Sequence, residues 1–343
     1  MKDGREVLNN VVYTQIPLHV PYGGVVPEIA SRAHVEKISE VVRTAMADFP
    51  VDAVAVTYGP GLSPALIVGL NAAKGLARAL KVPLIGINHI EAHLHTPFLY
   101  DAGTEPPETC PETCAPALGL AISGGHTNWI DMPEYGRYEI IGQTLDDAAG
   151  EAFDKAAKLL GLGYPGGPKV DKISKEYLAA QPSGSALIPF PKGRPRDGVT
   201  ALAGLPAELC VSFSGLKTSL LRYVQQNGGV EKLAADGEVP QIVASYQEAI
   251  VQAVADRTRT ALRRKAYRAL IVGGGVSLNS RLRAALQKVA AAEGVELLMA
   301  KPRYCGDNGA MIAGLGYYRR NHVEDAMSLD VNPCLEVGEL DNR

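Results

Sequence analysis

The sequence lacks a long apolar segment, a leader peptide and a cysteine framework. No apolar run reaches the roughly 18–20 residues that a membrane-spanning helix needs. The N-terminus MKDGREVLNN has neither the apolar core of a signal peptide nor the arginine-rich face of a transit peptide. Five cysteines, an odd number in a chain of 343 residues, do not form a set of disulfides. We therefore expect a protein of the bacterial-type cytoplasm, without membrane contact, rather than a mitochondrial one.

A strong charge of either sign is lacking as well. The chain has 34 Lys and Arg against 37 Asp and Glu, which gives a formal net charge of -3. Any contact with RNA must then use local basic patches, because there is no global attraction to nucleic acid. With 46% hydrophobic residues the chain can bury a sizeable core. Since single cores stop growing near ~250 residues, two domains are expected.

Hydrophobic patterns in the first part of the chain predict an α/β architecture. Residues 7–20 alternate and are β-branched, which predicts one or two strands, and residues 28–49 have the spacing of an amphipathic helix. Residues 51–59, 63–80 and 84–87 predict a strand, a helix and a strand. Such a βαβ unit pairs its strands in parallel with a right-handed crossover.

A long Pro-rich loop over residues 101–116 is expected to be exposed and to mark the first domain boundary. It contains the tandem repeat PETCPETC, which places Cys110 and Cys114 four residues apart. A metal site at these two thiols is a minor alternative to a plain surface loop.

Three glycine-rich turns after residue 120 lie next to predicted strands and helices. They are SGGHT at residues 123–127, YPGGP at residues 164–168 and GGG at residues 273–275. Glycines let the backbone approach a ligand closely and leave N–H groups free to bind anionic oxygens. The strand before GGG and the helix after it match a phosphate or nucleoside cradle. Ordinary turns also use glycine, so the residues alone leave both interpretations open.

Further expectations concern acidic residues and irregular segments. Asp146 and Asp147 precede a predicted helix, whose dipole they are expected to complement, while Asp154 is expected on its solvated face. Residues 181–211 are rich in Pro, Gly and Arg, which predicts an exposed, basic insertion that can contact phosphates. Residues 331–340 are expected to form an exposed tail.

The stretch KVPLIGINHIEAHLH, residues 81–95, places two histidines at helical spacing. If a helix follows the strand, His89 and His93 lie on one face, close enough to bind one metal ion. Glu91 falls on another face, so the motif differs from the metalloprotease pattern H-E-x-x-H. Asp307, in CGDNGAMIA, is by itself an ordinary helix cap. Surface histidines and a cap therefore remain an alternative to a metal site.

Eight motifs together resemble one family, the TsaD tRNA threonylcarbamoyladenosine transferases of bacteria and mitochondria. They are YGGVVPEIASR, GPGL, HIEAH, SGGHT, DDAAGEAFDKAAKLLGLGYPGGP, SFSGLKT, VGGGVSLNSRLR and CGDNGAMIA, in colinear order from about Asn10 to about Tyr318. The resemblance implies an actin-like, sugar-kinase-like (ASKHA) α/β fold with two domains around a nucleotide cleft. The first comprises residues 1–113, completed by a C-terminal helix in residues 307–343, and the second residues 114–306. Family members begin with a strand and hairpin that this sequence lacks, so its first sheet is expected to be incomplete.

The family transfers a threonylcarbamoyl group from threonylcarbamoyl-AMP to N6 of the adenosine beside the anticodon, in tRNAs reading ANN codons. Carried onto this chain, the metal ligands are His89, His93 and Asp307, with iron (Fe2+) expected and zinc as the alternative. Such a site leaves coordination positions open for ligand oxygens. No general base follows from the residues. The resemblance implies that the following residues bind the nucleotide, threonylcarbamoyl-AMP or ATP: Ala121, Ile122, Ser123, Gly124, Gly125, Asp154, Gly167, Asp171 and Asn279.

Expected partners follow from the same resemblance: tRNA, a TsaB-like paralogue, a TsaE-like P-loop ATPase and an upstream threonylcarbamoyl-AMP synthase of the TsaC/Sua type. Three other hypotheses compete with it. A zinc metalloprotease lacks support because the H-E-x-x-H base is absent. A sugar kinase or Hsp70-like ATPase with this fold uses acidic residues and magnesium in place of a His/His/Asp set. A noncatalytic scaffold does not need the three ligands and the glycine turns that this chain contains.

Overall fold

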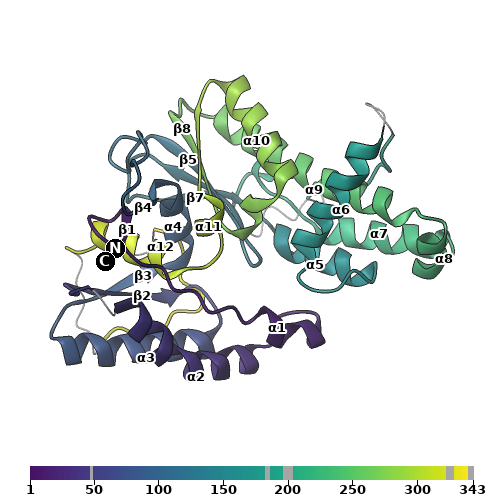
Figure 1. The fold of residues 1–343 in the computed structure, drawn as a ribbon. Coiled ribbons are helices and arrows are strands. Elements are labelled where there is room, and N and C mark those ends of the chain that lie inside the picture. Colours follow the sequence, from purple (N-terminus) through teal and green to yellow (C-terminus); the bar gives the residue numbers. More distant parts are fainter. Residues whose placement is uncertain (47–48, 182–185, 196–203, 322–327, 339–343) are drawn as a thin grey trace. The chain divides into compact units, whose positions relative to one another are not determined.

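The computed structural model divides into two compact units, which are described separately (Figure 1). Unit 1 comprises Met1–Ala115, Met132–Glu139 and Met299–Arg343, and unit 2 comprises Pro116–Asp131 and Ile140–Leu298. The structure describes the following ranges: residues 1–46, 49–181, 186–195, 204–321 and 328–338. Within these ranges, no helix combines the length and the apolar character that crossing a membrane requires.

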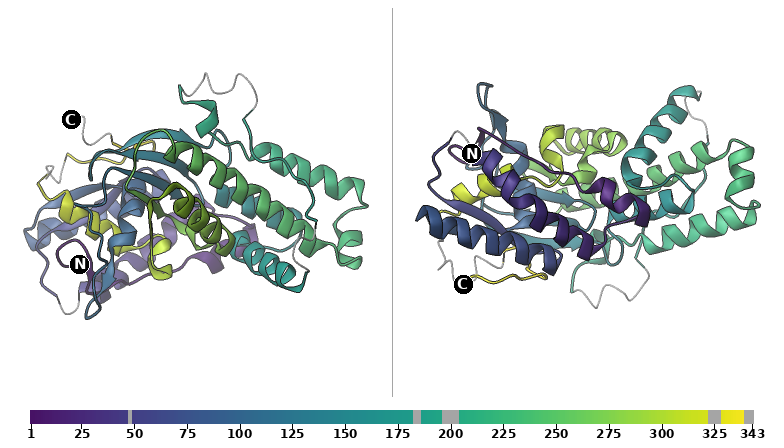
Figure 2. Two further views of the ribbon diagram at one scale, coloured as in Figure 1. Left: turned by 90° about the horizontal axis from the view of Figure 1, so that it is seen from above. Right: turned by 60° about the horizontal axis from the view of Figure 1, so that its bottom comes forward.

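Unit 1 contains the predicted βαβ unit. Strands β2 (Val54–Gly59) and β3 (Leu84–Asn88) pair in parallel, and helix α3 (Ser63–Leu80) connects them. A proline in the first turn of α3 suits a helix start, where its missing N–H is not needed. Helix α2 (Pro27–Met46) packs beside α3, as both views of Figure 2 show. The strand, helix, strand order predicted for this region is confirmed.

The strands predicted over residues 7–20 are mostly absent from the structure. Strand β1 is only Glu6–Val7 and pairs in parallel with β4 (Tyr100–Asp101). Residues 16–19 form a short helix, α1 (Ile16–His19), with a proline in its first turn, and the 3-10 turn η1 (Val20–Tyr22) follows. Proline cannot donate to a strand ladder but fits the first turn of a helix, so the strand prediction was wrong there.

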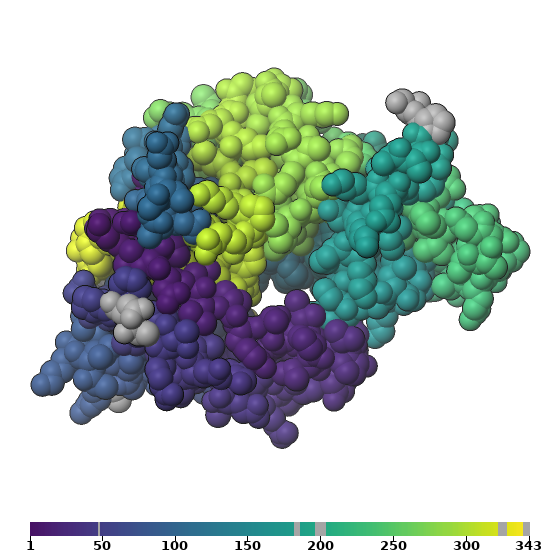
Figure 3. All heavy atoms as spheres, in the orientation of Figure 1, coloured from purple at the N-terminus to yellow at the C-terminus, as the bar shows by residue number. Residues whose placement is uncertain are grey.

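Two helices of unit 1 come from the end of the chain. These are α11 (Pro302–Cys305) and α12 (Gly309–Tyr318); the helix expected in residues 307–343 is confined to α12 in the described part. α12 is largely buried and packs against β2 and β3. The loop between β4 and unit 2 is exposed at residues 102–106, and Figure 3 shows it, in blue, projecting from the surface.

Residues 331–338 are packed against unit 1, so the expectation of an exposed tail was wrong for this part. Leu335 is buried and belongs to a cluster with Leu70 of α3 and Leu84 of β3. The N–H of Asn332 donates to the carbonyl oxygen of Tyr58 at 2.8 Å. Apolar residues within this irregular segment cover the sheet, although the segment has no regular period that reveals it. Residues 339–340 lie outside the described ranges.

The sheet of unit 2 has five strands in the order β7-β6-β5-β8-β9. Central strands β5 and β8 pair in parallel, and every residue of both is buried, as in parallel strands covered on both faces. Because they are parallel neighbours, the turns that follow them leave the same edge of the sheet. The bounds are β5 Ala117–Ile122, β6 Thr127–Met132, β7 Glu139–Gln143, β8 Ala269–Gly273 and β9 Glu296–Met299.

Helices of unit 2 pack around the long helix α9 (Val239–Leu262), whose inward residues are mostly small or β-branched. It contacts α6 and α10 most extensively and also touches β5. The other helices are α5 (Ala149–Leu159), α6 (Gly166–Ala180), α7 (Ser214–Gln226), α8 (Val230–Ala235) and α10 (Ser280–Glu293), with 3-10 turns at Ala207–Leu209 (η4) and Gly275–Leu278 (η5).

The basic segment 181–211 was predicted to be an exposed insertion, and its described part confirms this only in part: Lys192 and Arg194 are exposed, but other residues are buried. Phe190 is buried, with its ring centroid 5.9 Å from those of both Tyr223 and Tyr246. The N–H of Ile188 donates to Ser245 Oγ at 3.0 Å. One aromatic side chain therefore anchors a segment that has no periodicity. Residues 182–185 and 196–203 of this prediction lie outside the described ranges.

Asp146 was expected to complement the dipole of α5, but it caps α7 instead. Its carboxylate accepts hydrogen bonds from the N–H groups of Phe213 (2.7 Å) and Ser214 (3.2 Å) and from the hydroxyls of Ser212 (2.5 Å) and Ser214 (2.7 Å). Burial opposes ionisation of this carboxyl group, yet the four hydrogen bonds together lower its pKa. The first N–H of α5, that of Ala149, donates instead to the hydroxyl of Thr127 at 3.0 Å.

Replacing this cap should destabilise the protein. Asp146→Ala is expected to lower the free energy of unfolding by about 1 kcal/mol at neutral pH, as for other lost caps. The folded pKa lies below the ordinary value of 3.8, so the contribution is complete above that value and is lost as the pH falls through the folded pKa. Urea denaturation of both proteins at several pH values measures the difference. Asp236→Ala, which removes one exposed ion pair with Lys232, is the control; equal stability of wild type and Asp146→Ala at neutral pH would contradict the assignment.

Candidate functional site

Helix α4 (His89–His95) begins directly after β3 because Asn88 caps it. Asn88 Oδ1 accepts the N–H groups of Ile90 (2.9 Å) and Glu91 (3.3 Å), and its amide nitrogen donates to the carbonyl oxygen of Glu336 at 2.9 Å. The helical spacing predicted for His89 and His93 is therefore present. Both side chains lie on one face of α4, one turn apart.

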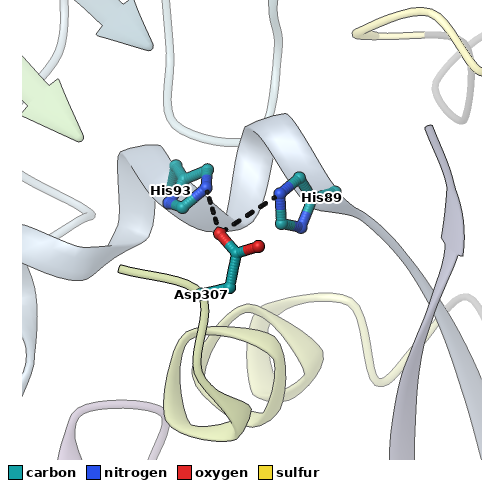
Figure 4. A group of neighbouring side chains, drawn as sticks. All are labelled: His89, His93 and Asp307. Carbon is teal, nitrogen blue, oxygen red and sulfur yellow. Dashed lines mark ion pairs between the residues drawn. The ribbon is translucent and has the colours of Figure 1, made fainter. Parts of the chain in front are cut away.

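His89, His93 and Asp307 meet in unit 1 (Figure 4). Asp307 Oδ1 lies 3.6 Å from His89 Nε2 and 3.2 Å from His93 Nε2. Their possible ligand atoms all lie within 4.8 Å of one another, and among the described residues this is the one such group of His, Cys, Asp or Glu. Ligand atoms about 2.0–2.2 Å from one ion are separated by about 3–4 Å. The three residues are thus spaced to hold a metal ion.

Asp307 is not the cap of α12. That role belongs to Asn308, whose Oδ1 accepts the N–H of Met311 at 3.0 Å and whose amide nitrogen donates to the carbonyl oxygen of Gly306 at 2.8 Å. Asp307 precedes the cap, so its carboxylate points toward the histidines instead of the helix N–H groups, with 76% of the side chain exposed. The plain cap that the sequence left open for Asp307 is therefore excluded.

The surroundings of His93 fit an ion. Its side chain is only 2% exposed, and apart from the 3.2 Å approach of Nε2 to Asp307 neither ring nitrogen has a hydrogen-bond partner within the described residues. Buried polar atoms are nearly always hydrogen-bonded, so unsatisfied ones need an explanation. A neutral imidazole is the commonest metal ligand, and two imidazoles with one carboxylate suit several divalent transition metals. The donor set and the unsatisfied nitrogens agree with a metal-binding role.

The other faces of α4 are anchored by buried polar contacts. Glu91 accepts a hydrogen bond from Arg319 Nη2 (3.0 Å) and another from the N–H of Gly338 (2.9 Å). His95 Nε2 contacts the carbonyl oxygen of Gly4 at 2.7 Å, and burial lowers the pKa of His95 to about 4, so this ring is neutral at pH 7. Sequence reasoning missed both anchors. An acidic residue between two histidines, on another helix face, was the available signal.

In unit 2 the residues expected to bind a nucleotide begin where β5 ends. Ala121 and Ile122 complete the strand, and the turn of SGGHT follows. At Gly124 and Gly125 an added Cβ meets no atom within 4 Å, so the backbone borders open space there. Gly274, after β8, has a φ of +101°, and a Cβ there would collide with the carbonyl oxygen of Ile122. The two glycine turns therefore lie against each other at one edge of the sheet.

Helices α5 and α6 bring further expected residues to this edge. The N–H of Gly150 donates to the carbonyl oxygen of Ser123 at 3.2 Å, and Asp154 Oδ1 accepts the N–H of Gly166 at 2.7 Å. Gly167, in the first turn of α6, also borders open space. Burial raises the pKa of Asp154, although hydrogen bonds from Gly166 and Gly167 oppose this. Asp154 was expected on a solvated helix face; it is half-buried, and its carboxylate is bonded to the start of α6.

Asp171 connects α6 to the start of α10, and Asn279 connects the start of α10 to α9. Asp171 accepts hydrogen bonds from the N–H (3.1 Å) and the hydroxyl (2.9 Å) of Ser280. Asn279 Oδ1 caps α10 by accepting the N–H of Leu282 at 2.9 Å, and its amide nitrogen donates to Gln247 Oε1 at 2.7 Å. These two side chains thus have internal partners as well as a place near the glycine turns.

Removal of one imidazole should empty the metal site. His93→Ala is expected to lose bound divalent metal, because two of three ligands hold an ion weakly, while thermal unfolding stays cooperative. Metal content after gel filtration, by plasma emission spectrometry, measures this. His34→Ala, on exposed helix α2, is the matched control and should bind metal as the wild type does. Undiminished metal in His93→Ala would refute the ligand assignment.

Comparison with known proteins gives the family. The model of the family "TsaD: tRNA N6-adenosine threonylcarbamoyltransferase" matches residues 6–314. The tRNA N6-adenosine threonylcarbamoyltransferase of Clostridium perfringens (strain ATCC 13124) is 43% identical, over 98% of this chain and 93% of the relative. That of Dictyoglomus turgidum is 42% identical, over 99% of this chain and 95% of the relative.

Solved structures agree on the fold. The crystal structure of T. kodakarensis HypF superposes with a TM-score of 0.55 and 13% identity over 86% of this chain. This chain spans 44% of that HypF, so the likeness concerns the fold alone. The shared fold is α/β, in agreement with the α/β architecture that the sequence resemblance implied. The family match over residues 6–314 and the identity to these relatives over nearly the whole chain show that the chain belongs to the TsaD family of tRNA N6-adenosine threonylcarbamoyltransferases, the transferases of tRNA threonylcarbamoyladenosine formation.

Proposed function

We propose that this transferase uses threonylcarbamoyl-AMP as donor and N6 of the adenosine beside the anticodon as acceptor, in tRNAs reading ANN codons. His89, His93 and Asp307 hold one divalent ion, and the glycine turns of unit 2 hold the acyl-adenylate. The observation that most supports the proposal is the meeting of these three side chains, from segments far apart in the chain, with Asp307 Oδ1 at 3.6 Å and 3.2 Å from the Nε2 atoms of His89 and His93. In a chain of this family, that set is a reason to expect metal-assisted acyl transfer.

Iron as Fe2+ is the proposed ion, and zinc is the alternative. Both accept imidazole and carboxylate ligands, so the donor set is compatible with either. When bound, the ion supplies a Lewis acid that polarises an acyl oxygen. The buried ring of His93, without hydrogen-bond partners among the described residues, supports its assignment as a ligand. Asp307 supplies an oxygen from the loop before α12.

The proposed nucleotide site uses backbone atoms more than side chains. Gly124, Gly125 and Gly167 border open space, so the backbone at these three glycines allows a ligand to approach closely. Asp154 and Asp171 have oxygens that accept hydrogen bonds from ribose hydroxyls. The remaining wall is proposed to come from Ala121, Ile122, Ser123 and Asn279. A nucleotide cleft of ASKHA type is part of this proposal.

The proposed reaction is an acyl transfer without a covalent enzyme intermediate. The adenosine N6 attacks the carbonyl carbon of the threonylcarbamoyl group, the bond from that carbon to the phosphate oxygen breaks, and AMP leaves. The attacking nitrogen loses one proton, whose acceptor is not assigned. Because AMP is a good leaving group, the protein has to position the amine and stabilise developing negative charge.

A protease function is disfavoured by the position of Glu91. In an H-E-x-x-H site the glutamate serves as base beside the metal. Here Glu91 is fully buried and hydrogen-bonded to Arg319 and Gly338, on a face of α4 other than that of the histidines. The carboxylate is thus held away from the position that a base would need.

Proposed partners are a TsaB-like paralogue, a TsaE-like P-loop ATPase and a synthase that supplies threonylcarbamoyl-AMP. The tRNA substrate follows from the family. Lys192 and Arg194 are exposed in the described part of the basic segment, and we propose that they contact tRNA phosphates.

Reconstitution tests this function directly. Purified protein is supplied with threonine, bicarbonate, ATP, the synthase, the two partner proteins and tRNA, and the tRNA nucleosides are analysed by mass spectrometry. The wild type should form threonylcarbamoyladenosine, and His93→Ala should form at least about 100-fold less, since transition-state charge stabilisation of this size is typical. Absence of the product with the wild type and all partners would refute the proposed donor and acceptor.

The proposed nucleotide site at the glycine turns of unit 2 predicts a separate effect of mutation on nucleotide affinity. Gly125→Val adds methyl groups where no protein atom lies within 4 Å, so the folded chain should accommodate them while the ligand does not. Affinity for AMP or a non-hydrolysable ATP analogue, by calorimetry, should fall at least about tenfold, the effect of losing about 1.4 kcal/mol. Gly69→Ala, in α3 of unit 1 with equally open surroundings, is the control. Wild-type affinity in Gly125→Val would place the nucleotide elsewhere.

A further inference from the structure

The carboxylate of Glu91 lies between the two metal-site histidines in the sequence and is fully buried. One of its oxygens accepts a hydrogen bond from Arg319 Nη2 at 3.0 Å, and the other accepts one from the N–H of Gly338 at 2.9 Å. The Arg319 side chain is only 7% exposed. A buried charge is costly unless it is paired and hydrogen-bonded, so these contacts fix where Glu91 sits.

Helix α4 needs such contacts to keep its orientation. It has seven residues, whereas helices shorter than about 12 residues are marginal on their own. Asn88 defines where the helix starts, but a cap does not determine its rotation about the axis. The ion pair lies on a face other than that of the histidines, so a rotation that separates Glu91 from Arg319 also moves His89 and His93.

Arg319 lies at the far end of the element that also positions Asp307. α12 runs from Gly309 to Tyr318, Asp307 precedes its cap, and Arg319 is its C-cap. α12 packs against α4 as well as β2 and β3. A single buried helix therefore links the carboxylate of the site to the side chain that holds the helix of the two imidazoles.

We infer that Arg319 is a positioning residue for the metal site. Its ion pair with Glu91 holds α4 in the orientation in which His89 and His93 face Asp307. The inference rests on the proposed function, because it takes these three residues as ligands of an ion. It assigns a role to the acidic residue of HIEAH that is neither base nor ligand.

Arg319 also borders a cavity of about 910 Å3 in unit 1, which makes the inference testable by chemical rescue. The cavity wall includes Tyr135, Tyr138 and Tyr318 as well as Arg319 and Gly338. Truncation of Arg319 to alanine leaves a space that a small guanidinium ion can reach from solvent. Methylguanidinium in that space restores a planar cation with N–H donors next to Glu91.

The experiment measures Co2+ affinity and the visible spectrum of the Co2+-loaded protein. In Arg319→Ala the affinity should fall about tenfold or more, the usual effect of losing an outer-sphere partner, and the Co2+ bands should shift. Millimolar methylguanidinium should recover at least part of both changes in Arg319→Ala and have no effect on Glu91→Gln. Arg320→Ala removes the exposed neighbouring arginine and should leave affinity and spectrum unchanged.

Folding of the variants is checked by thermal denaturation. If Arg319→Ala does not fold, Arg319→Lys serves in its place, because it keeps a positive charge but not the planar fork, and its affinity should fall less. Wild-type Co2+ affinity and spectrum in the folded variant, even with reduced thermal stability, would overturn the inference, as would a loss of affinity that methylguanidinium leaves unchanged in Arg319→Ala. If instead the wild type binds no Co2+, or His93→Ala binds it equally well, the proposed metal site itself fails. The two failures are thus distinguishable.

Discussion

The approach of Asp307 to His89 and His93 is the central contact of the candidate site in unit 1. Asp307 Oδ1 lies within 3.6 Å of the Nε2 atoms of both histidines, although the His93 side chain is nearly buried. Such an arrangement is costly without a partner for the ring nitrogens, since buried polar atoms are otherwise satisfied. The structure maintains it by fixing both supporting helices: Asn88 sets the start of α4, and Asn308 sets the start of α12 and leaves Asp307 free of the capping role.

In unit 2 the corresponding feature is made of backbone rather than side chains: two glycine turns lie at one edge of the sheet. Strands β5 and β8 are parallel neighbours, so both end at one edge, and each is followed by glycines. Gly274 has to be glycine because a side chain would strike the carbonyl oxygen of Ile122. Gly124 and Gly125 face open space, so the packing of the described residues does not require glycine at these two positions. The acidic residues nearby form hydrogen bonds to helix starts: Asp154 accepts an N–H at the start of α6, and Asp171 accepts an N–H at the start of α10.

How far the sequence predicts this structure depends on whether a signal is local. The βαβ unit of β2, α3 and β3 and the amphipathic helix α2 are periodic, and they were predicted correctly. Segments with few periodic residues were not: residues 331–338 cover a sheet through isolated apolar side chains. Asp146 illustrates the same limit, because it caps a helix that begins 68 positions later, at Ser214.

The histidine pair was visible from spacing, but its third member was not. Asp307 is 214 positions after His93, and only family resemblance connected the two in the sequence. Likewise, nothing in the pattern of HIEAH indicates that Glu91 pairs with Arg319, 228 positions away. Contacts between distant segments depend on the fold, which is why the fold class was predictable and the buried ion pair was not.

X-ray absorption at the metal K-edge is the most direct measurement of the central assignment, that His89, His93 and Asp307 bind one ion. Protein loaded with Fe2+ or Zn2+ should show nitrogen and oxygen neighbours at about 2.0–2.2 Å, with the outer-shell scattering of two imidazoles, one of which is lost in His93→Ala. A first shell of sulfur at about 2.3 Å, or one without imidazole scattering, would contradict it.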